Sequence, residues 1–260
     1  MSGPRIHPTA LVDGGAELDD DVDIGPFAII GAHVRIGRGT RVGAHTVIDG
    51  HTRIGNDNHV FHHASIGAAP QDLKYRGEAS ELIIGNHNLI REFATLHTGT
   101  AGGGMVTQVG DHNLLMNYSH VAHDCRIGHY TIVANGAQLG GHVTIHDYVV
   151  VGALVGIHQF VKIGESAILG AGAMVSQDVP PFCNATGDRA QLHGLNLVGL
   201  KRRGFGPEIV RDLKHAYRIM FHAGLKAAEA LARIRLEVRQ SREVDCFVAF
   251  IQASDRGVCR

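Results

Sequence analysis

The stretch IGPFAIIGAHVRIGRGTRVGAHTVI, residues 24–48, repeats one pattern every six residues. Each unit begins with an isoleucine or a valine, a glycine often comes next, and a small or β-branched residue stands four positions after the first. Neither the 3.6-residue period of a helix nor the 2-residue period of an ordinary strand gives this spacing. A parallel β-helix with three short faces does, because each face takes one hexapeptide and its aliphatic side chain points into the prism.

The same phase extends far beyond this stretch in both directions. It places Ile, Leu or Val at 26 of 26 positions, in three runs that span residues 6–66, 84–96 and 109–175. The repeat therefore predicts an all-β solenoid over residues 1–186, with coils of 18 residues about 4.8 Å apart. The two breaks in phase predict external loops at about 67–83 and 99–108. The general rule for parallel crossovers favours right-handed coils.

Residues 187–260 lack the hexads and predict an α-helical domain. Pro207 suits a first helical position, and apolar residues then recur at helical spacing up to Gly224. Two more helices are predicted over 225–238 and 244–251. From Arg189 to Arg242 there are 12 Lys and Arg against 4 Asp and Glu, a net charge of +8. This charge indicates either a solvated helical surface or a docking surface for an acidic partner.

Composition limits the classes of function. The chain has 260 residues with 34 glycines, no tryptophan and a formal net charge of −1, which gives no bulk attraction to nucleic acid or anionic membranes. The four cysteines form no CxxC pair, so we expect a reducing compartment and no disulfide framework. No stretch resembles a signal peptide or approaches the ~20 apolar residues of a membrane span. We therefore expect a cytoplasmic protein.

One of the many histidine clusters falls inside the hexads, at residues 120–125, with the sequence HVAHDC. A coil of 18 residues predicts which residues lie above this segment, with neighbouring rungs about 5 Å apart. Cys125 takes the small inward position of its hexad and should be buried and inert. The predicted patch lies on three successive coils and contains His123, Asp124, Gly141, His142, His158 and Gln159.

This patch has the parts needed for acyl transfer. A neutral His123 can take a proton from an attacking hydroxyl, and Asp124 can orient its ring. Gly141 can present its backbone N–H to a developing oxyanion. No Ser or Cys is placed as a nucleophile, so direct attack by the acceptor is favoured over an acyl-enzyme. Three alternatives stay open: a metal site around the His120-x-x-His123 pair, a histidine cluster without a catalytic role, and a non-catalytic β-helix scaffold.

Six blocks of sequence carry a resemblance to a known family. They are QDLKY at 71–75, HVAHDC at 120–125, GHV at 141–143, HQF at 158–160, QDVPP at 177–181 and GLKRRGF at 199–205. In these blocks the chain resembles the UDP-N-acetylglucosamine O-acyltransferases, which catalyse the first step of lipid A synthesis in Gram-negative bacteria. The resemblance covers essentially all 260 residues.

The resemblance implies left-handed coils and a homotrimer with active sites between subunits. It implies transfer of a 3-hydroxyacyl group from acyl carrier protein to the glucosamine 3-hydroxyl of UDP-N-acetylglucosamine. No bound cofactor or metal is implied, because phosphopantetheine arrives on the carrier protein. The basic C-terminal helices then become the docking surface for that acidic carrier. An amino-sugar acceptor, which gives an amide product, stays open as an alternative.

The resemblance also assigns residues. It makes His123 the general base, Asp124 its partner and the Gly141 N–H the oxyanion donor. Ala171 stands where the family limits acyl length and predicts an intermediate or slightly shortened chain, of about ten to fourteen carbons. Val198 departs from the family by replacing an acid near the nucleotide. The residues implied to line the substrate groove are Gln71, Asp72, Lys74, His97, His120, His142, His158 and Gln159, with Asn196, Arg202 and Arg203 near the nucleotide.

Two relatives of the same fold class are less compatible with the sequence. The N-acyltransferase that acts later in lipid A assembly carries an extra N-terminal uridine-binding domain, for which hexads that begin at Ile6 leave no room. A small acetyltransferase that uses coenzyme A would lack the loop around Asp72 and the long helical tail. We therefore expect the O-acyltransferase reaction.

Overall fold

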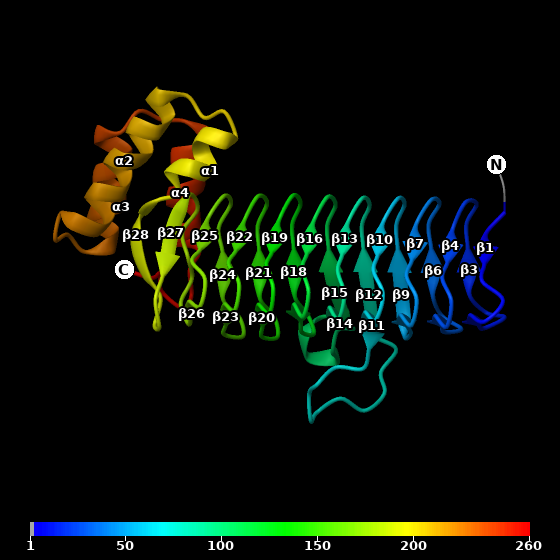
Figure 1. Ribbon diagram of the computed structural model, residues 1–260. Coiled ribbons are helices and arrows are strands. Elements are labelled where there is room, and N and C mark those ends of the chain that lie inside the picture. The colour runs from blue at the N-terminus through cyan, green and yellow to red at the C-terminus, as the bar shows by residue number, and fades with distance from the viewer. Residues whose placement is uncertain (1–2) are drawn as a thin grey trace.

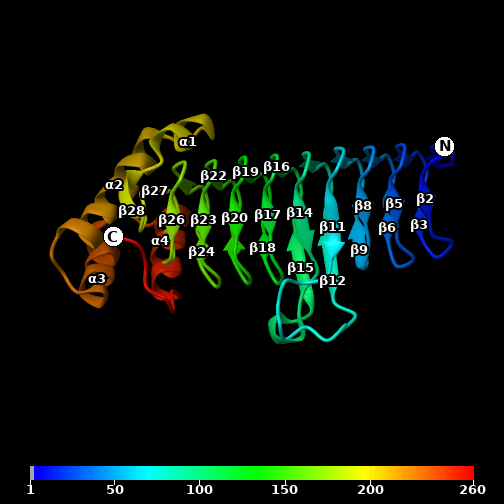
Figure 2. The ribbon, with the colours of Figure 1, turned by 60° about the horizontal axis from the view of Figure 1, so that its bottom comes forward.

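A computed structural model describes residues 3–260 as a three-sided prism of short parallel strands with helices at one end (Figure 1). The N-terminal coils form the far end of the prism, and the chain advances one coil at a time toward the helices. Each full coil contributes one strand to each of three sheets. A second view shows the same long prism, from which one loop region projects between β11 and β15 (Figure 2).

Three long sheets form the faces of the prism. The strands of each sheet are given below in the order in which they lie side by side. The first sheet contains β1 (Arg5–Ile6), β4 (Asp23–Ile24), β7 (Arg41–Val42), β10 (His59–Val60), β13 (Leu89–Ile90), β16 (Leu114–Leu115), β19 (Ile132–Val133), β22 (Val150–Val151), β25 (Ile168–Leu169), β27 (Cys183–Thr186) and β28 (Gln191–Leu195). The second contains β2 (Leu11–Val12), β5 (Ile29–Ile30), β8 (Val47–Ile48), β11 (Ser65–Ala68), β14 (Thr95–His97), β17 (His120–Val121), β20 (Gln138–Leu139), β23 (Gly156–Ile157) and β26 (Met174–Val175). The third contains β3 (Glu17–Leu18), β6 (Arg35–Ile36), β9 (His51–Ile54), β12 (Glu81–Ile84), β15 (Val106–Val109), β18 (Arg126–Ile127), β21 (Thr144–Ile145) and β24 (Lys162–Ile163).

The register between coils follows the predicted spacing of 18 residues. Ile24 pairs with Val42, and Leu115 pairs with Val133. The spacing lengthens at the two loops, since Val60 pairs with Ile90 and Ile90 with Leu115, which are 30 and 25 residues apart. Twelve and seven extra residues therefore leave the prism and return without disturbing the stack. The spacing shortens at the last coil, where Leu169 pairs with Ala185, 16 residues further on.

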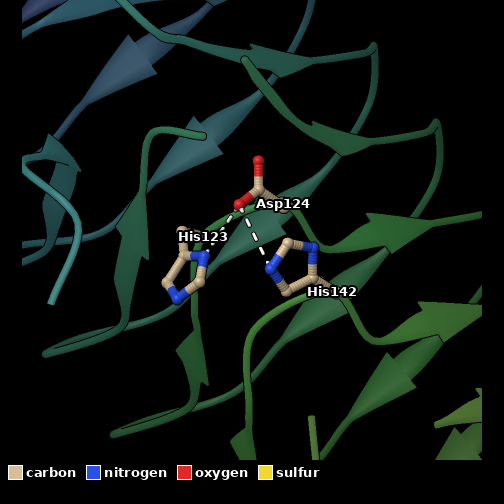
Figure 3. Close-up of side chains that lie close together, drawn as sticks. All are labelled: His123, Asp124 and His142. Carbon is tan, nitrogen blue, oxygen red and sulfur yellow. Dashed lines mark hydrogen bonds and ion pairs between the residues drawn. The ribbon is translucent and has the colours of Figure 1, made fainter. Parts of the chain in front are cut away.

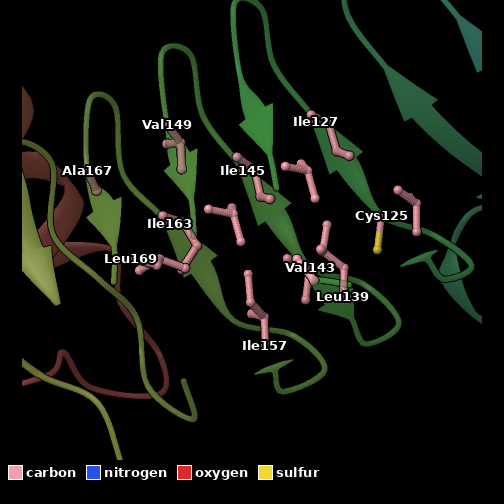
Figure 4. Packing of buried hydrophobic residues seen from close by; sticks show 14 of the residues in the cluster. Cys125, Ile127, Leu139, Val143, Ile145, Val149, Ile157, Ile163, Ala167 and Leu169 are labelled. Carbon is pink, nitrogen blue, oxygen red and sulfur yellow. The ribbon is translucent and has the colours of Figure 1, made fainter. Parts of the chain in front are cut away.

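The repeated aliphatic side chains form the core of the prism (Figure 4). Every hexad aliphatic from Ile24 to Val175 is buried, with an exposed fraction of 4 % or less. Ile6, at the open N-terminal end, is 45 % exposed because no coil lies beneath it. Burying each such side chain contributes about 1.5–3 kcal/mol relative to leaving it in water. The core is therefore a narrow aliphatic column, as the glycine-rich, aromatic-poor composition predicts.

The corners of the prism use left-handed backbone three residues after many of the hexad aliphatics. Non-glycine residues with φ near +60° occupy most of these turns, Phe27 and His63 among them. Rings at one corner stack on one another at centroid distances of 4.9–5.2 Å. We call this stack the aromatic corner; it consists of Phe27, His45, His63, Phe93 and Tyr118.

The prism ends in an antiparallel pair, β27 and β28, and then in four helices. The helices are α1 (Leu197–Arg202), α2 (Pro207–His222), α3 (Ala227–Glu237) and α4 (Arg242–Gln252). The last three confirm the predicted helices, including Pro207 at the first position of α2. Sequence analysis predicted an α-helical domain from residue 187, so the strand β28 is a departure from it, and α1 is a helix of that domain that it did not place individually. Both are short elements without a long apolar period, and α1 depends on Asn196, whose side chain accepts from the Gly199 N–H.

Candidate active site

Three successive turns of the prism bring the predicted patch together. His123 follows β17, Gly141 follows β20 and Gln159 follows β23, so the three occupy one corner at successive heights. The His142 N–H donates to the His123 carbonyl at 3.0 Å, and the Phe160 N–H donates to the Gly141 carbonyl at 3.0 Å. The 18-residue spacing thus predicts these neighbours correctly.

His123 and Asp124 form a close pair (Figure 3). The Nδ1 of His123 lies 2.8 Å from Oδ2 of Asp124, whose side chain is completely buried. The Nε2 of His142 lies 3.7 Å from the same oxygen, which is an electrostatic contact and too long for a hydrogen bond. Because the carboxylate accepts from Nδ1, the tautomer with a bare Nε2 is favoured at His123. That nitrogen is the one that can take a proton.

The second external loop covers the Asp124 carboxylate. Oδ1 accepts from the Thr100 N–H at 2.9 Å, and Oδ2 accepts from the Thr100 hydroxyl at 2.6 Å. The Asp124 N–H in turn donates to Oγ1 of Thr107 at 2.7 Å. Sequence reasoning missed Thr100, because its loop lies outside the hexad phase and no spacing rule connects it to residue 124. It also missed Thr107 on β15, although the 18-residue register places Thr107 one coil below residues 124 and 125.

Gly141 lies directly against the His123 ring. A Cβ at position 141 would lie 2.5 Å from Cε1 and 2.7 Å from Nε2 of His123, so any side chain would push the ring away. Among residues 3–260, the Gly141 N–H has no hydrogen-bond acceptor. A bare imidazole nitrogen and a backbone N–H without an acceptor therefore belong to two residues that lie against each other and line one groove.

The neighbouring histidines are held neutral. Burial, with help from His120 and His123, lowers the pKa of His97 to about 4. Burial and His123 also lower the pKa of His120, whose Nδ1 contacts Oγ1 of Thr95 at 2.7 Å. For His142, burial lowers the pKa against the opposing effect of Asp124. Near neutral pH these rings thus add no positive charge around His123.

A groove of about 630 Å³ opens beside the pair. Six of the predicted site residues line it: Gln71, His120, His123, Gly141, His158 and Gln159. His97 does not line the groove, and its ring lies edge-on to His120 at a centroid distance of 5.0 Å. Sequence analysis missed Met174, Ser176 and Arg189, which also line the groove. Continuing the 18-residue spacing from Gly156 and His158 would have found the first two.

The remaining predicted residues lie outside the groove lining. Asp72 and Lys74 are in the first loop, where Asp72 accepts from the Lys74 N–H at 2.9 Å and its charge acts to raise the pKa of His142. Asn196 and Arg203 are held within the chain: Asn196 caps α1, and Arg203 bonds Glu165 at 3.0 Å. Arg202 and Ala171 are exposed.

The pair also bears on the metal alternative. Ligand atoms of His123, Asp124 and His142 lie within 4.8 Å of one another, which is close enough for a shared ion. The Asp124 carboxylate, however, already accepts three hydrogen bonds, from Thr100 twice and from His123 once. A metal would have to displace these donors from a buried group, so the geometry fits a hydrogen-bonded pair better than a coordination site.

The cysteine that follows Asp124 in the sequence is inert. Cys125 is completely buried, and burial raises the pKa of its thiol to about 12. A thiol in this state is a poor nucleophile, as its inward position in the hexad predicts.

Within residues 3–260, no helix is both long enough and apolar enough to cross a membrane.

Comparison with known proteins identifies the family. Residues 178–259 match the family model described as UDP N-acetylglucosamine O-acyltransferase, domain 2, and residues 15–50, 107–141 and 142–177 match the bacterial transferase hexapeptide model. The acyl-[acyl-carrier-protein]–UDP-N-acetylglucosamine O-acyltransferase of Trichlorobacter lovleyi is 58% identical over 258 residues, covering 98% of this chain and 99% of its own. The chain belongs to the UDP-N-acetylglucosamine O-acyltransferase family.

Solved structures of the UDP-N-acetylglucosamine O-acyltransferase family share the whole fold. LpxA from Acinetobacter baumannii is 42% identical with a TM-score of 0.96, covering 98% of this chain and 99% of its own. UDP-N-acetylglucosamine acyltransferase from Francisella novicida is 41% identical with a TM-score of 0.95, covering 98% and 94%. The prism is a left-handed parallel β-helix, as the family resemblance implied and contrary to the general rule for parallel crossovers.

Proposed function

We propose that this enzyme transfers a 3-hydroxyacyl group from acyl carrier protein to the glucosamine 3-hydroxyl of UDP-N-acetylglucosamine. The observation that carries the proposal is that His123, with a bare Nε2, lies against Gly141, whose N–H has no acceptor among residues 3–260, in the lining of one groove. The names of its relatives, acyl-[acyl-carrier-protein]–UDP-N-acetylglucosamine O-acyltransferases, supply the substrate class.

The proposed reaction is a direct attack on the thioester. The Nε2 of His123 accepts the proton of the sugar hydroxyl as its oxygen bonds to the carbonyl carbon. The carbonyl electron pair moves to the oxygen, which accepts from the Gly141 N–H. When the C–S bond breaks, the carbonyl re-forms and sulfur keeps the bonding pair. The imidazolium, stabilised by Asp124, returns its proton to that sulfur, leaving an ester and the free thiol of the carrier. The thiol belongs to phosphopantetheine on the carrier, so the proposed chemistry uses no bound cofactor and no metal.

The groove residues then bind and orient the substrates. His120, held neutral by burial, and His158 present imidazole nitrogens to the groove, and Gln159 offers an amide. These groups suit the hydroxyls and the acetamide of a sugar. Asp72 and Lys74, on the projecting loop, would contact substrate with Gln71.

The nucleotide contacts are proposed at α1, with unequal roles. Arg202 is exposed and free to bind a phosphate, whereas Arg203 also stacks over Tyr148 at 3.7 Å from its ring centroid. We assign Arg203 and Asn196 to positioning α1, and Arg202 to the nucleotide itself. Val198 is 63 % exposed and offers no charge or hydrogen bond there.

The outer faces of the prism support a homotrimer. The outward residues of the third sheet are mostly charged or polar, Arg35, Arg53 and Arg126 among them, with Ile83 as an exception. Those of the first sheet are apolar from β13 to β25: Leu89, Leu114, Ile132, Val150 and Ile168. An apolar sheet face of this length needs a cover, and a second copy would close the groove on the adjoining sheet from the side.

The carrier protein is proposed to dock on the helices. On α2, Lys214 and Arg218 have no acidic side chain within 4 Å among residues 3–260, whereas Arg239 is paired with Glu208 and Asp212. Unpaired cations on one surface attract an acidic partner and raise its association rate. A reaction that draws on a carrier protein and a sugar nucleotide agrees with the expected cytoplasmic location.

The acyl length is proposed to be set where the groove ends, near Met174 and Arg189. Ala171, on the adjoining corner, remains the proposed limit, and an intermediate or slightly shortened chain is expected.

The test of function is acyl transfer by the purified protein. UDP-N-acetylglucosamine is offered with 3-hydroxyacyl carrier proteins of ten, twelve and fourteen carbons, and mass spectrometry identifies the product.

An ester with one preferred length is the expected result of this assay. Product from a 3-amino sugar nucleotide alone would move the acceptor to the amide alternative. No product from either acceptor with any donor would refute the enzyme proposal and leave the non-catalytic scaffold. Equal rates with all three donors would remove the role of Ala171.

A further inference from the structure

Thr100 makes two hydrogen bonds to the one carboxylate that supports the proposed base. Its backbone N–H reaches Oδ1 of Asp124 at 2.9 Å, and its hydroxyl reaches Oδ2 at 2.6 Å. Oδ2 is also the oxygen that contacts His123 at 2.8 Å. Thr100 is 5 % exposed and Asp124 is 4 % exposed, so water does not compete for these bonds. A single residue thus fixes both oxygens of the carboxylate.

The local backbone is built to bring Thr100 there. Thr100 stands at the N-cap of the short 3-10 helix η1 (Ala101–Gly103), yet its hydroxyl makes no capping bond. The hydroxyl that would ordinarily satisfy the helix is directed to Asp124 instead. A Cβ at Gly103 would overlap the Asp124 carboxyl group, so this approach of the loop requires glycine. The loop therefore approaches the Asp124 carboxylate closely only because position 103 is a glycine.

We propose that Thr100 is a positioning residue of the acyl-transfer site, which acts through Asp124 to orient His123. The inference rests on the proposed function, because it takes His123 as the base. With both oxygens held by Thr100, the carboxylate cannot rotate, and its remaining acceptor direction on Oδ2 points to Nδ1 of the imidazole. The ring is then fixed against Gly141 with Nε2 bare, the form that accepts a proton.

Oδ2 of Asp124, to which both donors bind, also determines how strongly the carboxylate stabilises a charged His123 ring. The Thr100 hydroxyl and the His123 ring both donate to Oδ2, so the hydroxyl takes part of the negative charge that would otherwise stabilise an imidazolium. Without the hydroxyl, the carboxylate holds a charged ring more strongly and orients it less well. The two effects predict a slower chemical step and an activity that needs a higher pH to develop.

The test compares three variants in the full-length protein. Thr100→Val removes the hydroxyl but keeps the backbone N–H and nearly the same volume. Thr100→Ser keeps the hydroxyl and removes only the methyl group. Thr98→Val is the matched control, because Thr98 is a buried threonine two residues away whose hydroxyl contacts Ser80 at 3.1 Å and not Asp124. Steady-state kcat and KM for the sugar nucleotide are measured from about pH 5.5 to 9, a range that brackets the ordinary pKa of histidine.

Thr100→Val is expected to lower kcat about 10- to 100-fold with KM changed less than about threefold, since a small misplacement of a catalytic group costs this much. Its acid limb of kcat/KM should lie at higher pH than that of the wild type. Thr100→Ser should restore most of kcat, and Thr98→Val should keep both rate and profile. An unshifted profile in Thr100→Val, or an equal loss in Thr98→Val, would overturn the proposal.

The wild-type assay separates this inference from the proposed function. If the wild type forms no product, the function fails; if it forms product and Thr100→Val matches it, only the role of Thr100 fails. If Thr100→Val does not fold, as judged by its circular dichroism melting curve, the decision passes to Thr100→Ser. A serine variant that folds normally but retains less than about a tenth of kcat overturns the proposal, and one with near wild-type kcat and profile supports the hydroxyl as the acting group.

Discussion

The aromatic corner and the corner that carries Asp124, His142 and Phe160, which we call the site corner, are built by the same repeat. Both place non-glycine residues at φ near +60°, one coil apart. Both stack rings: His45 on His63 at 4.9 Å, and His142 on Phe160 at 4.3 Å. The repeat alone therefore does not distinguish a structural histidine from one with chemistry.

What separates the two corners is the loop over Asp124, because rings are exposed at both. Phe27 of the aromatic corner is 54 % exposed, and Phe160 of the site corner is 47 % exposed. At the site corner the second loop closes over Asp124, and burial lowers the pKa of His142. A scaffold of similar coils acquires a site where an inserted loop excludes water from one rung, because hydrogen bonds and charges act more strongly there.

The largest expected effect contrasts one histidine from each region. His123→Ala should lower kcat by about 10²–10⁴-fold, since it removes the group that takes the proton. His63→Ala, in the exposed stack, should leave kcat within about twofold, because it touches no reacting group. Both are measured with the carrier-protein assay on protein of matched melting temperature. A near wild-type rate in His123→Ala would refute the base assignment, and a large loss in His63→Ala would end the contrast between the corners.

A smaller effect is expected from a single methyl group at the site corner. Gly141→Ala places a Cβ 2.5 Å from Cε1 of His123, which displaces the ring and crowds the oxyanion donor. We expect kcat to fall about 100-fold, the scale of a misplaced catalytic group or a lost oxyanion donor. Gly14→Ala is the control, because a Cβ there meets nothing within 4 Å. Equal rates in the two variants would show that the ring does not depend on Gly141.

The sequence predicts the periodic part of this site and not the loop that completes it. The neighbours of His123 follow from the 18-residue coil, and because both loops leave and rejoin the prism, the phase is intact after Val109. Thr100 could not be found this way, since its contact with Asp124 depends on a loop conformation that has no period. Sequence spacing predicts which residues share a corner, whereas cover depends on the folded loop.

The elements at the end of the prism differ in how far the sequence predicts them. The amphipathic pattern of α2 is long enough to show a helical period, and its first residue, Pro207, is predicted correctly. The six-residue α1 and the β27–β28 pair are too short for any period and depend on tertiary contacts, such as the Asn196 side chain that donates to the Ser166 carbonyl at 2.9 Å. Short elements of this kind follow from their surroundings more than from their own residues.

The smallest expected effect tests burial at the site through stability and not rate. His97 is 6 % exposed with a pKa lowered from 6.5 to about 4, so between these two values the unfolded chain binds a proton that the folded chain does not. The free energy of unfolding should therefore fall as pH drops through this window. In His97→Gln this fall should be smaller than in the wild type. His63→Gln, at an exposed position, should keep the wild-type slope. Urea unfolding at about pH 7.5 and 4.5 measures the difference. An equal loss of unfolding free energy in His97→Gln and in the wild type would show that burial does not lower the pKa of His97.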